Sequence, residues 1–159
     1  MDKKVDLLWI KIQELDSDAY LFSFWENRKD WIIKVVSSAD SNFETVICIL
    51  YRLSKLLNDK EEYASVYYLY KFGYLPIEMK LTNSTSLNEL KFEFGRGLVH
   101  NRKYEHSKSL FNELHSINYD NDRISDWRRQ SIIKSDLDKY WFKTYFLPRF
   151  GVLILTIAF

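Results

Sequence analysis

The sequence predicts an all-α fold, and three observations lead to it. Apolar residues recur at three- and four-residue intervals along most of the chain, which places them on one face of a helix and divides the chain into about six or seven helices. The 159 residues include only 4 Gly and 2 Pro, which is little turn chemistry for a β-sandwich or barrel. Hydrophobic residues make up 47% of the chain, enough to form a core.

Two helices are predicted at the start of the chain. In residues 5–15 the side chains of Leu8, Ile12 and Leu15 share one helical face. The following helix runs to about residue 36. Between them, Asp16-Ser17-Asp18 supplies the short polar side chains that cap a helix N-terminus.

A capping box predicts where the next pair of helices begins. In Ser41-Asn42-Phe43-Glu44 the Ser and Glu side chains have the spacing at which each bonds the other residue's backbone N–H. We expect a helix from this box to Asn58-Asp59-Lys60, and a second helix over residues 61–74. Gly73 and Pro76 mark the end of the second helix.

The same order recurs after a polar loop at residues 81–85. Ser86-Leu87-Asn88-Glu89 is a second capping box. The helix it opens is broken at Asn101-Arg102-Lys103, and a further stripe runs from Tyr104 to Leu114. A last helix is expected over residues 125–146, with an apolar side formed by Trp127, Ile133, Leu137, Tyr140 and Trp141.

The two helix pairs align with each other as an internal repeat. Ser54 stands nine residues before Tyr63, and Gly95 stands nine residues before Tyr104. The positions that follow align as Val66 with Ser107, Tyr70 with Phe111, and Gly73 with Leu114. Small residues allow two helices to approach closely, and aromatic residues fill the groove beside them, so neither pair buries its apolar face alone.

This pattern resembles the tetratricopeptide repeat, a helix–turn–helix unit of about 34 residues. Residues 87–119 match it better than residues 43–77, where Val66 stands at a position that the family fills with Ala. The 41 residues from Tyr63 to Tyr104 exceed the family's period, and the loop at 81–85 absorbs the excess. The resemblance covers under half of the chain. It implies a right-handed stack of helical hairpins, and the alternative is an ordinary helical bundle with generic core stripes.

Composition excludes several classes of protein. The net charge of +1, from 23 basic and 22 acidic residues, gives no long-range attraction to nucleic acid or to an anionic membrane. Cys48 is the single cysteine, which excludes an internal disulfide and a cysteine-based zinc site. Its apolar neighbours predict a small core residue. Because no apolar stretch of a signal peptide follows Met1, we expect a cytoplasmic location.

No motif for metal, cofactor or catalysis is evident. His100, His106 and His115 lack the spacing of a zinc hydrolase and are expected at the surface or at helix ends. The pairs Arg96/His100 and Arg102/His106 are similar to the Arg and His of small helical HEPN ribonucleases, although that class has a longer spacing. In such a pair the Arg would stabilise phosphorane charge and the His would move the proton.

The remaining charged motifs have simpler interpretations. Gly95-Arg96-Gly97 lacks the later Gly and Lys of a phosphate loop. The basic residues near Trp127 are interleaved with carboxylates, which favours a solvated face of mixed charge over an RNA-binding or acidic-peptide-binding surface. The basic residues are Arg123, Arg128, Arg129 and Lys134, and the carboxylates are Asp122, Asp126, Asp136 and Asp138.

The C-terminal run from Phe150 to Phe159 is apolar except for Gly151 and Thr156. It is shorter than the roughly 20 residues of a membrane span, but basic and aromatic residues precede it as they precede a span. Three interpretations stay open: a terminal element of the core, a contact with a membrane surface, and the beginning of a span in a truncated product. We therefore divide the chain into a single helical domain, residues 1–147, and an apolar tail, residues 148–159.

The function expected from these observations is a non-enzymatic scaffold for protein–protein interaction, with a protein or peptide partner as the resemblance implies. The alternative is a toxin–antitoxin or phage-defence component, either a HEPN-like ribonuclease or an immunity protein. No catalytic residue, metal ligand or cofactor is predicted, and the sequence does not identify the binding residues.

Overall fold

The computed structural model describes residues 3–146, and within this range the chain is helical and contains no strand. Two π-helical segments, Tyr70–Tyr74 and Phe142–Phe146, continue α4 and α7, and a 3-10 turn covers Glu78–Lys80. The α-helices are α1 (Lys3–Gln13), α2 (Asp18–Ser37), α3 (Phe43–Asp59), α4 (Tyr63–Leu69), α5 (Thr85–His100), α6 (Tyr104–Ser116) and α7 (Asn121–Trp141). The prediction of an all-α fold is confirmed.

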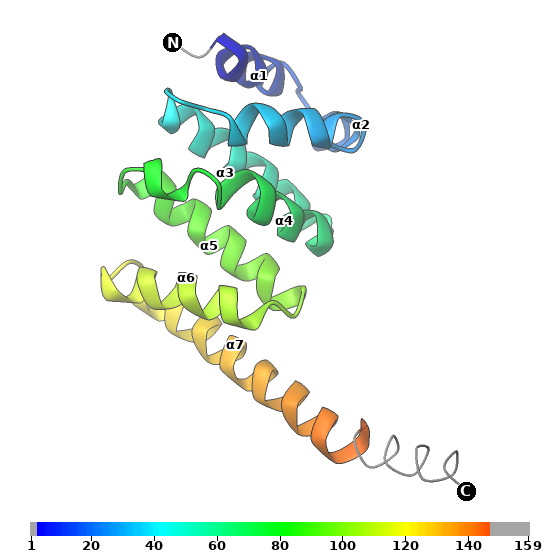
Figure 1. Cartoon of the computed structure of the whole chain (residues 1–159), viewed down its shortest axis with the longest axis vertical. Helices are drawn as coiled ribbons and strands as arrows, with labels where there is room; N and C mark the ends of the chain where they lie inside the picture. The colour runs from blue at the N-terminus through cyan, green and yellow to red at the C-terminus, as the bar shows by residue number, and fades with distance from the viewer. Residues whose placement is uncertain (1–2, 147–159) are drawn as a thin grey trace, which may run out of the picture.

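The helices follow one another along the longest axis of the molecule, with α1 at one end and α7 at the other (Figure 1). Helices next to each other in the sequence pack together, and so do α1 with α3, α3 with α5, and α5 with α7. The core is therefore continuous along this axis, because each helix packs against the one or two helices that precede it in the sequence.

Two clusters of buried side chains form the core. The larger cluster extends from α1 to α6 and includes Trp25, Tyr74 and Phe94, which are fully buried. The smaller cluster joins α5, α6 and α7 through Phe92 and Phe111, among others. The apolar stripes predicted from helical spacing on α3 and α5 are the faces buried in these clusters.

The turns after α3, α5 and α6 share one backbone geometry. In each turn a residue other than glycine takes a left-handed conformation, and the N–H that follows it bonds a carbonyl five residues earlier, which is the Schellman pattern of helix termination. The left-handed residues are Glu61 (φ 59°), Arg102 (φ 57°) and Asn118 (φ 53°). The closing bonds are Glu62 to Leu57 (2.8 Å), Lys103 to Leu98 (2.8 Å) and Tyr119 to Leu114 (3.1 Å).

Helix α5 is held between α4 and α6 at two glycines. A Cβ atom at Gly95 would lie 2.6 Å from Cζ of Phe111 on α6, and one at Gly97 would lie 2.5 Å from Cγ1 of Val66 on α4. The Ser107 hydroxyl donates to the Gly95 carbonyl at 3.0 Å. Only residues without a side chain allow this approach, so Gly95 and Gly97 set the helix spacing.

Both predicted capping boxes are wrong, whereas the cap before α2 is confirmed. The N-cap of α3 is Asn42, which makes no side-chain cap and whose amide donates to Asp6 at 2.8 Å instead. A contact with α1 thus replaces the local cap. Helix α5 begins at Thr85, because Ser84 accepts the N–H of Leu87. Before α2, Ser17 accepts the N–H of Tyr20 as expected.

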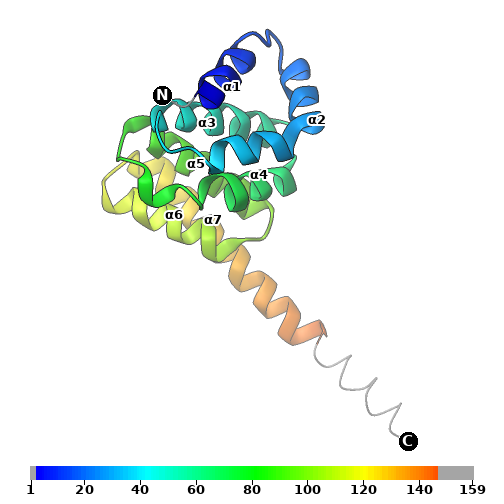
Figure 2. The same ribbon diagram turned by 45° about the horizontal axis from the view of Figure 1, so that its top comes forward.

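The apolar side predicted for the last helix is exposed for most of its length. Ile133, Leu137 and Tyr140 are exposed, and the buried positions of α7 include Ser131 and Ser135 instead. The face of α7 with these two serines packs on α6, where Ser131 donates to the Tyr104 carbonyl and the Tyr104 hydroxyl donates to Asp138, so the apolar side two residues away faces outward. The end of α7 also extends beyond the other helices (Figure 2).

The predicted tail, residues 148–159 with the apolar run Phe150 to Phe159, lies outside the described residues. Within residues 3–146, none of the helices has both the length and the apolar character that crossing a bilayer requires.

We expect Gly95→Ala to lower the free energy of unfolding by about 1–3 kcal/mol through overpacking against Phe111. The same change on an open helix face would raise it by up to about 1 kcal/mol, because alanine is the better helix former. Urea denaturation measures the difference. In a Phe111→Leu background, which removes the ring atoms that the new Cβ meets, the cost of Gly95→Ala should shrink. An undiminished cost would contradict the assigned contact.

Glu61→Gly should raise the free energy of unfolding by about 1 kcal/mol, because glycine takes the left-handed conformation without steric penalty. Lys60→Gly is the matched control, since Lys60 has a φ of −90° and glycine there only adds unfolded-state entropy. Thermal denaturation of both variants tests the prediction. A gain in both, or in neither, would be inconsistent with it.

Candidate binding groove

An open groove of about 680 Å³ runs over α3. Helices α1 and α2 form one wall, and the N-terminal part of α5 forms the other. The lining residues are Trp9, Asp18, Leu21, Cys48, Tyr51, Arg52, Lys55, Leu56, Asp59, Thr85, Ser86 and Glu89.

Helix α3 supplies the floor of the groove, and its buried face and its groove face differ in chemistry. Its buried face carries the aliphatic stripe predicted from the sequence. On the groove side, Cys48, Arg52, Lys55 and Asp59 recur at the intervals that share a helical face. Buried Leu56 contributes at the edge of the floor. The groove therefore combines apolar surface with a row of polar and charged side chains.

Cys48 departs from the sequence prediction of a core residue. Its side chain is half-buried and lines the groove. Burial, with the nearby Glu44 carboxylate, raises the pKa of the Cys48 thiol above its ordinary value. The thiol is therefore protonated at neutral pH and acts as a small apolar part of the groove floor.

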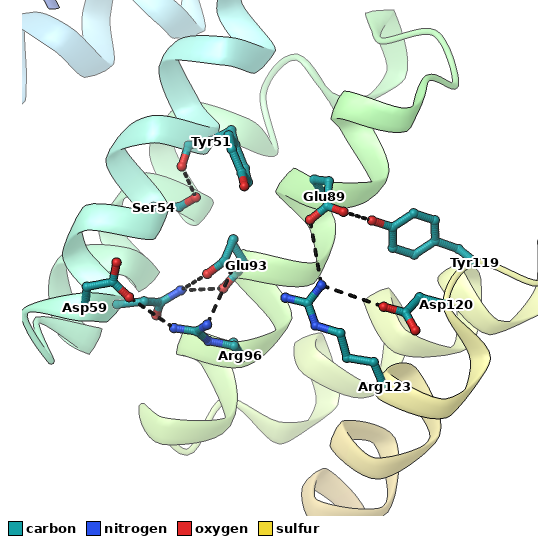
Figure 3. A network of polar contacts seen from close by, with 10 residues as sticks. Tyr51, Ser54, Asp59, Glu89, Glu93, Arg96, Tyr119, Asp120 and Arg123 are labelled. Atoms are coloured by element: carbon teal, nitrogen blue, oxygen red, sulfur yellow. Dashed lines mark hydrogen bonds and ion pairs between the residues drawn. The ribbon is translucent and has the colours of Figure 1, made fainter.

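A polar network joins α3 to α5 beside the groove (Figure 3). The Asn58 amide donates to the buried Glu93, at 2.9 Å both to its carboxylate and to its backbone carbonyl. Arg96 lies 3.6 Å from Glu93 and 3.6 Å from Asp59, which lines the groove. A carboxylate as buried as that of Glu93 requires such partners. The Arg96 guanidinium is therefore shared between the carboxylates of Glu93 and Asp59.

A second network joins α5 to the start of α7 (Figure 3). The Tyr119 hydroxyl donates to Glu89, and this contact together with burial raises the pKa of Tyr119. The Arg123 guanidinium lies 4.0 Å from Glu89 and 3.7 Å from Asp120. It also lies over the Phe92 ring, 3.6 Å from the ring centroid. Glu89, like Asp59, thus lies in an ion pair whose cation also contacts a second carboxylate.

The pairs that resemble nuclease residues have structural partners. His100 stacks on Tyr63, with ring centroids 4.5 Å apart, and meets Trp127 edge-on at 5.8 Å. Arg96 holds the two carboxylates described above. Of the second pair, Arg102 occupies a left-handed turn position, and the His106 ring lies 5.6 Å from that of Tyr70.

Residues 3–146 hold no group of three His, Cys, Asp or Glu side chains placed to bind a metal ion. Of the cations that the sequence places near Trp127, Arg123 pairs with acidic neighbours, as expected of a face of mixed charge. Sequence reasoning did not identify the groove residues. The available signal was the row of polar residues on the otherwise apolar helix α3.

Comparison of the chain with protein-family models, with curated proteins and with solved structures gave no significant match.

The histidine stack should make stability depend on pH. Burial, with the nearby Lys134 and Arg96, lowers the pKa of His100 below its ordinary value. The unfolded chain therefore binds more protons below about pH 6.5, so the contribution of neutral His100 is present above that pH and is lost as the pH falls. Urea denaturation from about pH 7 to pH 5 should show a smaller loss for His100→Phe, which keeps a ring on Tyr63 but does not titrate. An equal loss would contradict this assignment.

Proposed function

We propose that the protein is a non-enzymatic scaffold for protein–protein interaction, built from tetratricopeptide-like helical hairpins, whose groove over α3 binds a peptide segment of a partner. The single observation that carries the proposal is this groove, with apolar and polar side chains contributed by α1, α2, α3 and α5. Its volume of about 680 Å³ lies in the range of ligand sites, roughly 300–1,000 Å³.

Positions aligned in the sequence have corresponding places in the fold, which supports the hairpin interpretation. Tyr63 and Tyr104 are the first residues of α4 and α6. Glu61 and Arg102, which are 41 residues apart like the two tyrosines, both take the left-handed conformation. Units that each supply one helix to a common groove suit the binding of an extended segment.

The chemistry of the groove supports binding rather than catalysis. Leu21 and Leu56 are buried at its base, and charged and hydroxyl side chains lie around them. An apolar centre with a polar rim is the arrangement of protein-recognition surfaces. The ribonuclease alternative is less favoured, because Arg96 is engaged by Glu93 and Asp59 and the His100 ring is stacked on Tyr63.

The test uses peptides selected from a displayed random library on the full-length protein. Thr85→Trp places a large side chain into the groove from an exposed position, and we expect it to weaken peptide binding at least about tenfold, a change of about 1.4 kcal/mol. Ser109→Trp, on the exposed side of α6 outside the groove, is the matched control and should leave affinity unchanged. Fluorescence polarisation measures both.

Selection without enrichment of any peptide, or peptides that bind Thr85→Trp as tightly as the parent, would contradict the proposed function. Circular dichroism of each variant confirms that the helices are retained, so that a loss of binding reports on the groove.

A further inference from the structure

The carboxylates and the cations that line the groove differ in how many of them are in ion pairs. Of its three carboxylates, Asp59 is paired with Arg96, and Glu89 is held by Tyr119 and Arg123. The third, Asp18, lies in the first turn of α2, where the helix dipole favours a carboxylate, and it makes no ion pair among residues 3–146.

Neither of the two cations of the groove floor makes an ion pair among residues 3–146. Arg52 donates to the backbone carbonyl of Leu15 at 3.2 Å, a neutral acceptor that leaves its charge in place. Lys55 is exposed, and among residues 3–146 it makes no ion pair. The two stand three residues apart on α3, so both ammonium and guanidinium project from one face of that helix.

Apolar surface lies in the same groove as this pair. Trp9 and Leu21 line the wall that faces α3, and Leu56 follows Lys55 directly. A ligand that places a carboxylate between Arg52 and Lys55 therefore has space for a bulky apolar side chain within the same site. A basic ligand would instead meet these two cations, while two of the three carboxylates of the groove, Asp59 and Glu89, are already in ion pairs.

We propose that the segment bound by the groove is acidic, with an Asp or Glu side chain held by Arg52 and Lys55 and an adjacent bulky apolar side chain seated against Trp9, Leu21 and Leu56. This inference rests on the proposed peptide-binding function and specifies its ligand class. The attraction acts mainly on the association rate and on specificity, so binding weakens as salt rises.

Three pools of short fluorescein-labelled synthetic peptides test the inference against the full-length protein. The pools share a fixed Leu or Phe and differ only in the fixed neighbouring residue, which is Glu, Gln or Lys. Fluorescence polarisation at low and at physiological salt measures binding. We expect the Glu pool to bind at least about tenfold more tightly than the Gln pool, the Lys pool to bind most weakly, and the difference to narrow at the higher salt.

Charge reversal identifies the residues responsible. Lys55→Glu should abolish the preference for the Glu pool and favour the Lys pool, and Arg52→Glu should act in the same direction. Lys60→Glu is the matched control, because it changes the same charge at the end of α3 outside the groove and should keep the parent's preference.

The possible failures are distinguishable. Equal binding of the Glu and Gln pools, both weakened by Thr85→Trp, would overturn the acidic-ligand inference and leave the peptide groove intact. Preference for the Lys pool would overturn the inference as well. If no pool binds although the fold is retained, the acidic-ligand inference is overturned. The proposed peptide-binding function is contradicted only if the library selection fails as well.

Discussion

The close approach of α5 to its two neighbours is the constraint on which the rest of the structure depends. Gly95 admits the Phe111 ring from α6, and Gly97 admits Val66 from α4. Each contact is possible only because glycine has no Cβ atom. Each brings the backbone of α5 close to that of its neighbour, so that the smaller side chains around the contact pack densely. The positions of α4 and α6 follow from this spacing, and so does the line along which α3 and α7 meet α5.

The polar networks depend on the same spacing. Glu93 is buried between α3 and α5, where Asn58 and Arg96 reach its carboxylate. A buried carboxylate without these partners would cost several kcal/mol, so the contact selects one register of α3 against α5. On the next interface, Arg123 reaches Glu89 from α7 while its guanidinium covers Phe92. Ion pairs thus engage two carboxylates of the groove, Asp59 and Glu89, whereas Arg52 and Lys55 of its floor make no ion pair among residues 3–146.

The groove itself follows from the order of the helices. Because α3 packs against both α1 and α5, its outward face becomes the floor of a channel rather than a convex surface. Side chains that are unremarkable on an isolated helix, such as Lys55 and Cys48, then converge with Trp9 from a distant part of the sequence. The proposed recognition of an acidic segment depends on these side chains lying together in one groove.

The sequence by itself determined the helical class, most helix boundaries and the close contact at Gly95, because apolar spacing and helix-breaking residues are local signals. It also indicated a cap within Asp16-Ser17-Asp18, of which the structure uses Ser17. It misplaced the other two caps. Before α3, Asn42 bonds Asp6 across the fold, and this long-range partner overrides a local preference of about 1 kcal/mol. Before α5, the cap is again local but lies two residues earlier, at Ser84.

Only the tertiary structure decided which surfaces are covered. The apolar residues of α7 resemble a core stripe in the sequence, yet Leu137 is exposed because α6 packs on the opposite face of the helix, which carries Ser131 and Ser135. Cys48, surrounded by apolar neighbours in the sequence, faces a groove instead of the core. The spacing of apolar residues in the sequence shows that a helix has an apolar face. The groove and its cations, which make no ion pair, depend instead on which helices pack together, and the local sequence does not contain that information.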